Sequence, residues 1–180
     1  MKRIIFIIFF CFYNSLSLSF ASDLSDAVAL YNQVLQMITE AQDLEAPVIA
    51  LADCYKTKLQ QFEILAQSDP CLLGCLNSLT NLLNAMQNSK NVIKTDVDLL
   101  FGIKSVMSTI LAAMYENERL HQPEENADLL HDMLDSFNVA TAIMEQLEDA
   151  VDTFLEAQNL FDTILDLARN GCYDFGVLPC

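Results

Sequence analysis

The sequence has little glycine or proline, each occurring only four times in 180 residues. These residues mark turns and end helices, so their scarcity leaves few places where the chain can change direction. Stretches of alternating apolar and polar residues bounded by turn residues, the signature of β-strands, are missing as well. The sequence therefore predicts an all-α fold built from long helices.

Basic residues are also few. Nine lysines and arginines stand against 25 aspartates and glutamates, which gives a net charge of −16. A chain this acidic is repelled by nucleic acid and by anionic membrane surfaces. It attracts basic proteins, cationic ligands or divalent cations, although an excess of one charge also serves solubility alone. We expect no nucleic-acid partner, and a basic protein is the favoured partner.

The motifs that carry common enzyme chemistry are absent. The chain has no glycine-rich phosphate loop, no Gly-x-Ser-x-Gly elbow and no His-Glu-x-x-His pair. Glu124, Asp128, His131 and Asp135 follow the spacing of one helical face, but that face is expected to be solvated. The cysteines lack the second ligand pair that a zinc site needs. We therefore expect no catalytic residues, no metal and no cofactor.

The N-terminus has the features of an export signal. Lys2 and Arg3 precede an apolar run at 4–12, and residues 19–21 fit the small-x-small rule for signal peptidase. The run is too short for a comfortable membrane span, and an uncleaved anchor is the alternative. We predict a signal peptide over 1–21 and a secreted or periplasmic chain without stable membrane insertion after cleavage. Loss of the two basic residues lowers the net charge to −18.

Apolar residues recur every three or four positions along the rest of the chain, which is the period of an amphipathic helix. The first stretch, 22–44, is followed by Pro47, which either begins a second helix or kinks a single helix that continues to residue 66. Residues 67–70 form a break, and Asn88-Ser89 is a weak stop between two further helices. We predict a bundle domain over 22–170 with four to five mostly antiparallel helices. The expected apolar face of the first stretch consists of Leu24, Val28, Tyr31, Leu35 and Ile38.

The clearest helix lies near the C-terminus, where a heptad register holds from Met133 to Ala168 with one interruption at Gln158. At about 1.5 Å per residue, residues 124–169 would span about 70 Å. That is longer than any other helix predicted here. The helix would therefore pack across two shorter helices, or project and pair with another chain to give a homo-oligomer. Asn170-Gly171 is suited to end it.

The same helix is acidic without compensation. Between Leu120 and Ala168 there are twelve acidic residues and no lysine or arginine. A solvated face usually mixes both signs, so the missing basic residues favour docking to a basic partner or pairing with lysines elsewhere in the same or another chain. The candidate docking residues are Asp135, Glu145, Asp149, Asp152 and Glu156.

Five cysteines follow the predicted signal peptide: Cys54, Cys71, Cys75, Cys172 and Cys180. In an exported protein they are expected to form disulfides, and the odd number leaves one thiol over. We favour one bridge from Cys54 to Cys71 or Cys75. A second bridge, Cys172–Cys180, would close the tail 171–180 around Tyr173 and Phe175 as an added contact. The rival pairing ties a tail cysteine to Cys71 or Cys75.

Three functions fit these observations. The favoured one is a secreted, non-enzymatic helical bundle that acts by protein–protein interaction through the acidic face of the C-terminal helix. The second is a carrier of a small apolar ligand, because a core with seven methionines and eleven phenylalanines in the chain is adaptable. The third is a structural subunit that self-assembles through the long final helix and the odd cysteine.

Overall fold

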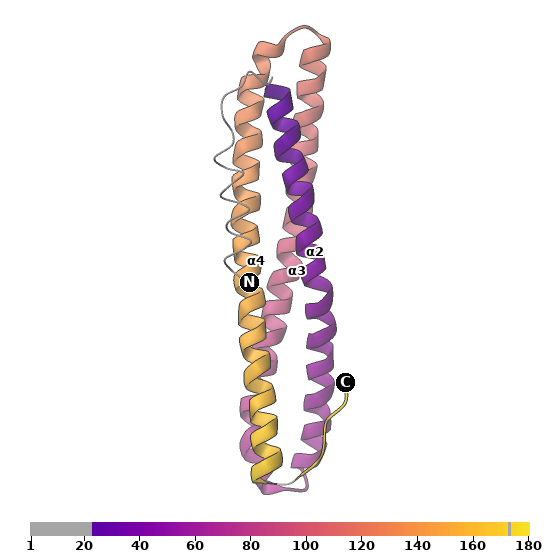
Figure 1. The fold of residues 1–180 in the computed structure, drawn as a ribbon, viewed down its shortest axis with the longest axis vertical. Coiled ribbons are helices and arrows are strands. Elements are labelled where there is room, and N and C mark those ends of the chain that lie inside the picture. Colours follow the sequence, from indigo (N-terminus) through magenta and orange to yellow (C-terminus); the bar gives the residue numbers. More distant parts are fainter. Residues whose placement is uncertain (1–22, 173) are drawn as a thin grey trace.

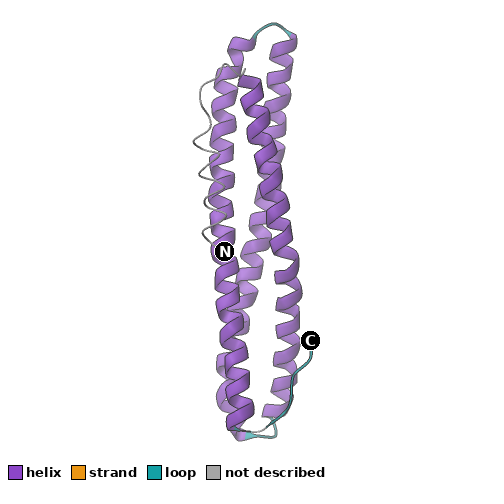
Figure 2. Ribbon diagram, in the orientation of Figure 1, coloured by secondary structure: helices purple, strands orange, loops and turns teal. Residues whose placement is uncertain are grey.

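In the computed structural model of the protein, residues 23–172 and 174–180 are described, so the predicted signal peptide, Ser22 and Tyr173 lie outside the described residues. Three long helices, α2 (Asp23–Ala66), α3 (Pro70–Arg119) and α4 (Asn126–Gly171), account for nearly all of the described chain. A short 3-10 helix, η1 (Pro123–Glu125), precedes α4. The helices form an elongated up-down-up bundle in which α2 and α4 run parallel and α3 runs antiparallel to both (Figures 1 and 2).

The all-α class and the long C-terminal helix are confirmed, but the predicted number of four to five helices is wrong. Of the two alternatives for residues 22–66, the structure shows one helix with Pro47 inside it. Proline removes one backbone hydrogen bond, at about 3 kcal/mol. The buried side chains of Ala41 and Val48 on either side hold the helix together through this point. Likewise α3 continues through Asn88-Ser89, because Ser89 is itself buried in the bundle.

The three helices consequently have similar lengths of 44, 50 and 46 residues. Each is about 65–75 Å long at 1.5 Å per residue. The expectation that α4 outreaches the other helices is therefore wrong. Its length does not require it to project from the bundle or to pair with a second chain.

The buried face of α2 differs from the predicted one. Only Ile38 of the predicted stripe is buried, while the other four residues are half-buried. The first half of α2 is apolar over a wide arc, and in a three-helix bundle each helix faces two neighbours, so the stripe at the centre of the arc becomes the core. The residues buried along the first half are Ala27, Leu30, Val34, Met37, Ile38 and Ala41.

Pro47 marks a change in the face that α2 turns inward. One buried line continues at seven-residue intervals along the whole helix. A second set of buried residues accompanies this line. Before Pro47 its members, such as Leu30 and Met37, come three positions after a residue of the line. After Pro47 its members, such as Ala52 and Leu59, come four positions after one. Because 3.6 residues per turn do not match a heptad, such a shift lets the helix stay on the core over its full length.

The heptad register predicted for α4 is nearly all buried, with Val151 half-buried. Ala150 and Ala157 are buried beside that register. Small side chains allow neighbouring helices to approach closely, which explains how a helix that faces two neighbours accommodates this wider buried arc.

Two disulfides close one end of the bundle. Cys71 at the start of α3 is bonded to Cys172 at the end of α4, with 5.6 Å between their Cα atoms. Cys54 within α2 is bonded to Cys180, the last residue, with 4.7 Å between their Cα atoms. Cys75 is the free cysteine. The rival pairing from the tail to Cys71 is thus confirmed, the favoured Cys54–Cys71/75 and Cys172–Cys180 pairings are wrong, and the bridges indicate an oxidising environment.

The local Cys172–Cys180 loop fails because the tail is extended and packs along α2 (Figure 1). Leu178 is buried, and the ring of Phe175 meets Phe62 of α2 edge-on at 5.7 Å between centroids. Arg169 of α4 lies over the Phe175 ring, 5.6 Å from its centroid. Burial of these apolar side chains draws the tail away from Cys172 and brings Cys180 to Cys54.

The far end of the bundle is held by hydrogen bonds. Asn126, at the start of α4, is 1% exposed, and its Oδ1 accepts from Nδ2 of Asn117 on α3 at 3.0 Å. The residue numbers in this contact and in the Cys71–Cys172 bridge have the same sum. The antiparallel helices α3 and α4 therefore keep one register from end to end.

We predict that the free energy lost when a disulfide is removed depends on whether the other disulfide is still present. The Cys71–Cys172 loop lies inside the Cys54–Cys180 loop, so either bridge alone closes a loop of over a hundred residues. With one bridge present, the other closes only the short ring through 54–71 and 172–180. Chain entropy then gives about 3–4 kcal/mol for the first bridge removed and about 5 kcal/mol for the second.

The measurement is urea unfolding of Cys71→Ser/Cys172→Ser, of Cys54→Ser/Cys180→Ser and of the quadruple variant. Substitution of Cys75 by serine is the control and is expected to change stability little. Equal losses at both steps would contradict the nested-loop account.

Candidate functional site

The outer surface of α4 carries the acidic residues that the sequence singled out. Asp135, Glu145, Asp149 and Glu156 are all exposed there, and Asp152 is half-buried. Asp135, Asp149 and Glu156 lie on one heptad line, and Glu145 and Asp152 lie on the next line toward α2. The predicted docking residues of α4 thus all lie on the outer side of this helix.

The tail does not extend this surface. Phe175 is half-buried against Phe62, as described above, and Tyr173 is outside the described residues. Phe175 therefore serves to attach the tail to α2, and the structure does not present it for contact with another molecule.

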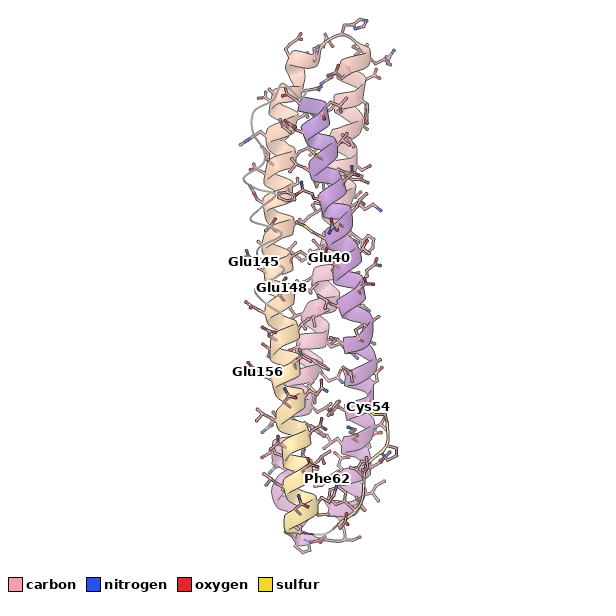
Figure 3. The ribbon with its side chains drawn as sticks, in the orientation of Figure 1. Glu40, Cys54, Phe62, Glu145, Glu148 and Glu156 are labelled. Carbon is pink, nitrogen blue, oxygen red and sulfur yellow. A yellow bond between two sulfur atoms is a disulfide. The ribbon has the colours of Figure 1, made fainter. Side chains whose placement is uncertain are left out.

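A carboxylate on α2 joins the acidic surface, and the sequence analysis missed it. Figure 3 shows Glu40 of α2 at the height of Glu145 and Glu148 of α4. The pKa of Glu148 is raised, first by partial burial and then by the charges of Asp152, Asp149, Glu145 and Glu40. Like charges raise the pKa of a carboxyl group because they disfavour its ionised form. We name Glu40, Glu145, Glu148, Asp149 and Asp152 the acidic band.

Glu148 could have been found from the sequence, because it lies three residues after Glu145 and four before Asp152 on one helix. Glu40 could not, since its place beside Glu148 depends on the parallel alignment of α2 with α4. Of the lysines considered as internal partners of the acidic helix, Lys58 does pair with α4, although at Asp162 and not in the acidic band. Lys58 pairs with Asp162 at 3.5 Å and Lys90 pairs with Asp53 at 3.3 Å.

Three further ion pairs in the described chain are each formed within one helix. Arg119 pairs with Glu116 and Arg169 with Asp166, each within one helical turn, while His131 lies 3.8 Å from Asp135. In the part of the chain that the structure describes, no lysine or arginine forms an ion pair with Glu145, Glu148 or Asp149. The charge of these residues is thus left uncompensated within this part of the chain.

A second surface feature is apolar and lies where α3 meets α4. Leu99 and Val106 on α3 are 50% and 54% exposed, and Val139 on α4 is 54% exposed. From the register set by Asn117–Asn126, Val139 lies level with the segment between Leu99 and Val106. We name these three residues, with half-buried Ile103, Ile110 and Ile143 between them, the apolar seam.

The apolar character of α3 is also evident from its composition. Among the described helices, α3 alone is long and apolar enough to cross a membrane. It contains an 18-residue window with a mean hydropathy of 1.6, and 22% of this window is buried. A core helix of a soluble protein can pass this test, but most of such a helix is buried. The small buried share means that α3 leaves apolar side chains at the surface, among them Leu99 and Val106.

The surface hollows of the described chain are shallow and open. One lies between α2 and α3 and is lined by Tyr31, Phe101, Lys104 and neighbouring serines and a threonine. Another lies under the tail, between Lys58, Asp162 and Leu178. Among the described residues no group of three or more histidines, cysteines or carboxylates could hold a metal ion.

Polar contacts beside the second hollow attach α4 to α2. The hydroxyl of Tyr55 donates to Oδ2 of Asp162, and Lys58 lies over the Tyr55 ring at 4.4 Å. Burial, followed by the hydrogen bond to the carboxylate, raises the pKa of Tyr55. These residues form a closed, satisfied group, and we assign them a structural role.

Asp96 is a carboxylate inside the bundle. It is 2% exposed, and its Oδ2 has no hydrogen-bond partner. It lies three heptads before Asn117 on the line of α3 that faces α4. Burial raises the pKa of Asp96 above its ordinary value of 3.8, because the ionised form loses its hydration without a compensating partner.

We predict that Asp96→Asn stabilises the bundle at neutral pH. Because the pKa of Asp96 is higher in the folded state, the protonated carboxyl contributes to the free energy of unfolding. This contribution is fully present below pH 3.8 and is lost as the pH rises through the folded-state pKa. Removing the charge should raise the free energy of unfolding at pH 7 by about 1–3 kcal/mol and give no gain below pH 3.8. The measurement is urea unfolding across this pH range, with Asp98→Asn, an exposed neighbour, as control. Destabilisation at pH 7 would contradict the prediction.

Comparisons with known proteins offer no shortcut to the function of these surfaces. Neither a protein-family profile, nor a curated protein sequence, nor a solved structure matches the chain.

Proposed function

We propose that the protein is an exported, non-enzymatic helical rod that acts by binding a basic protein partner on the acidic surface of α4. The observation that carries the proposal is the acidic band, in which five carboxylates from α2 and α4 lie together, and in which partial burial and the charges of the other four raise the pKa of Glu148. Repulsion of this kind disfavours the free protein, and a cationic partner relieves it.

The distribution of basic residues supports the proposal. Four basic residues form ion pairs with other carboxylates. Lys58 and Lys90 pair with Asp162 and Asp53, and Arg119 and Arg169 pair with Glu116 and Asp166. A protein that needed acidic residues only for solubility would gain stability by interspersing these basic residues among them. Within the described residues, none of these basic side chains forms an ion pair with Glu145, Glu148 or Asp149, which favours recognition over solubility.

Rigidity also supports docking. The bundle is closed by two disulfides at one end and by the Asn117–Asn126 hydrogen bond at the other. A preorganised surface loses little conformational entropy on binding, so a modest number of charge contacts suffices for useful affinity. Electrostatic attraction would chiefly increase the association rate.

We expect the triple variant Glu145→Gln, Glu148→Gln, Asp149→Asn to bind a lysine-rich peptide roughly tenfold more weakly than the unmodified protein at low ionic strength. The three charges act on the same bound peptide. In high salt these charges are screened, so most of the difference in affinity between the variant and the unmodified protein should disappear. The measurement is fluorescence anisotropy of a labelled oligolysine peptide at low and high salt.

The matched control is Glu124→Gln, Glu125→Gln, Asp128→Asn, which removes the same charge from exposed positions in η1 and the first turn of α4. It is expected to weaken binding less than threefold. If both triple variants lose the same affinity, the peptide responds only to net charge, and the acidic band is not a docking site.

A further inference from the structure

We propose that the partner presents an amphipathic basic helix, and that this helix lies along α4 with its apolar side on the apolar seam. Its basic side would lie on Asp135, Asp149 and Glu156, which share one heptad line and are named here the acidic line of α4. This inference deepens the proposed function and rests on it. It assigns a role to Leu99, Val106 and Val139, which the acidic band alone does not use.

The first step is the adjacency of apolar and acidic residues on α4. Val139 lies one turn after Asp135, and Leu160 lies one turn after Glu156. Residues four apart are neighbours on a helix surface. Val139 and Leu160 are 54% and 55% exposed. The outer face of α4 therefore has an acidic edge next to an apolar edge.

The second step is that α3 extends the apolar edge. Leu99 lies three residues after Asp96, and Val106 lies three residues after Ile103, both beside the line of α3 that faces α4. Among the exposed residues of α3 between positions 74 and 113, only Lys94 and Asp98 are charged. In a chain with 25 acidic residues, this surface is nearly neutral. An apolar side chain of a partner can approach it without leaving a carboxylate desolvated.

The third step is the shape of the occupant. The acidic line and the apolar seam run side by side along the rod, so the occupant needs basic and apolar side chains along two parallel edges. An amphipathic helix provides that arrangement, with positions i, i+3, i+4 and i+7 on each edge. Charge complementarity with Asp135, Asp149 and Glu156 requires its polar edge to be basic.

A second copy of the chain does not meet this requirement. Of its seven basic residues outside 1–21, Lys58, Lys90, Arg119 and Arg169 are already in ion pairs. A copy would bring mostly carboxylates to the acidic line. An anionic membrane is disfavoured for the same electrostatic reason.

The test uses the full disulfide-bonded chain and two labelled peptides of about 18 residues made from leucine and lysine. One has amphipathic helical spacing, and the other has the same composition in scrambled order. We expect the amphipathic peptide to bind at least about tenfold more tightly. The variant Leu99→Gln, Val106→Gln, Val139→Gln should lose this preference and bind both peptides alike.

The control variant is Ile64→Gln, Leu134→Gln, Leu155→Gln, which removes three exposed apolar side chains away from the seam. Leu134 and Leu155 lie on the α4 line of Asp162, which contacts Tyr55 of α2, and Ile64 lies on α2. The control should keep the preference, and circular dichroism should show native helicity in both variants.

Each other outcome overturns the inference. Equal binding of the two peptides by the unmodified chain, with the acidic-band variant still impaired, would leave the proposed function standing and remove the role of the seam. Failure to bind either peptide would remove both. Self-association in sedimentation, or binding to anionic vesicles, that is lost in the seam variant would assign the seam to a second copy or to a membrane instead.

Discussion

Burial of apolar side chains along α2, α3 and α4 is the interaction on which the other features depend. None of the helices would be stable alone in water, because most helix stability in proteins comes from packing of an amphipathic face. The core is continuous over the full length of the helices and includes fully buried Phe62, Phe154 and Phe161 as well as Met86, Met107 and Met114. This continuity carries α2 through Pro47 and α3 through Ser89. It also tolerates Asp96, whose burial is unfavourable in itself.

The long core has a consequence for charge. A rod has more surface for its volume than a sphere, so many polar residues are needed to cover it, and here most of the charged ones are acidic. The bundle withstands the repulsion because its ends are held independently of the charges, by disulfides and by the Asn117–Asn126 contact. Glu145, Glu148 and Asp149 can therefore lie close together on the surface without opening the helices.

Much of the fold could be predicted from the sequence, and the errors have physical causes. The period of the apolar residues identified helices along the described chain. The Asp69-Pro70 turn and Gly171 marked helix ends that the structure has, and the heptad register of α4 identified its buried residues. Pro47 and Asn88-Ser89 misled because a local preference of about 1–3 kcal/mol yields to packing on both sides. The acidic residues of α4 were found because they lie on one helix. Glu40 and the apolar seam were missed because they exist only once α2, α3 and α4 are aligned, and disulfide pairing is likewise a property of the tertiary fold.

The bridge from the last residue to the middle of α2 also determines how the rod would transmit mechanical tension. A force applied between Asp23 and Cys180 passes through the Cys54–Cys180 bond and residues 23–54 only. The whole of α3 and α4 lies inside the covalent loop and carries none of the load. Stretching would peel the first half of α2 from its neighbours and then stop, because the remaining chain cannot extend without breaking a covalent bond. The apolar seam and the α4 residues of the acidic band lie on the helices inside the loop, whereas Glu40 lies on the segment that carries the load. A molecule bound to α3 and α4 alone would therefore be insulated from such a pull.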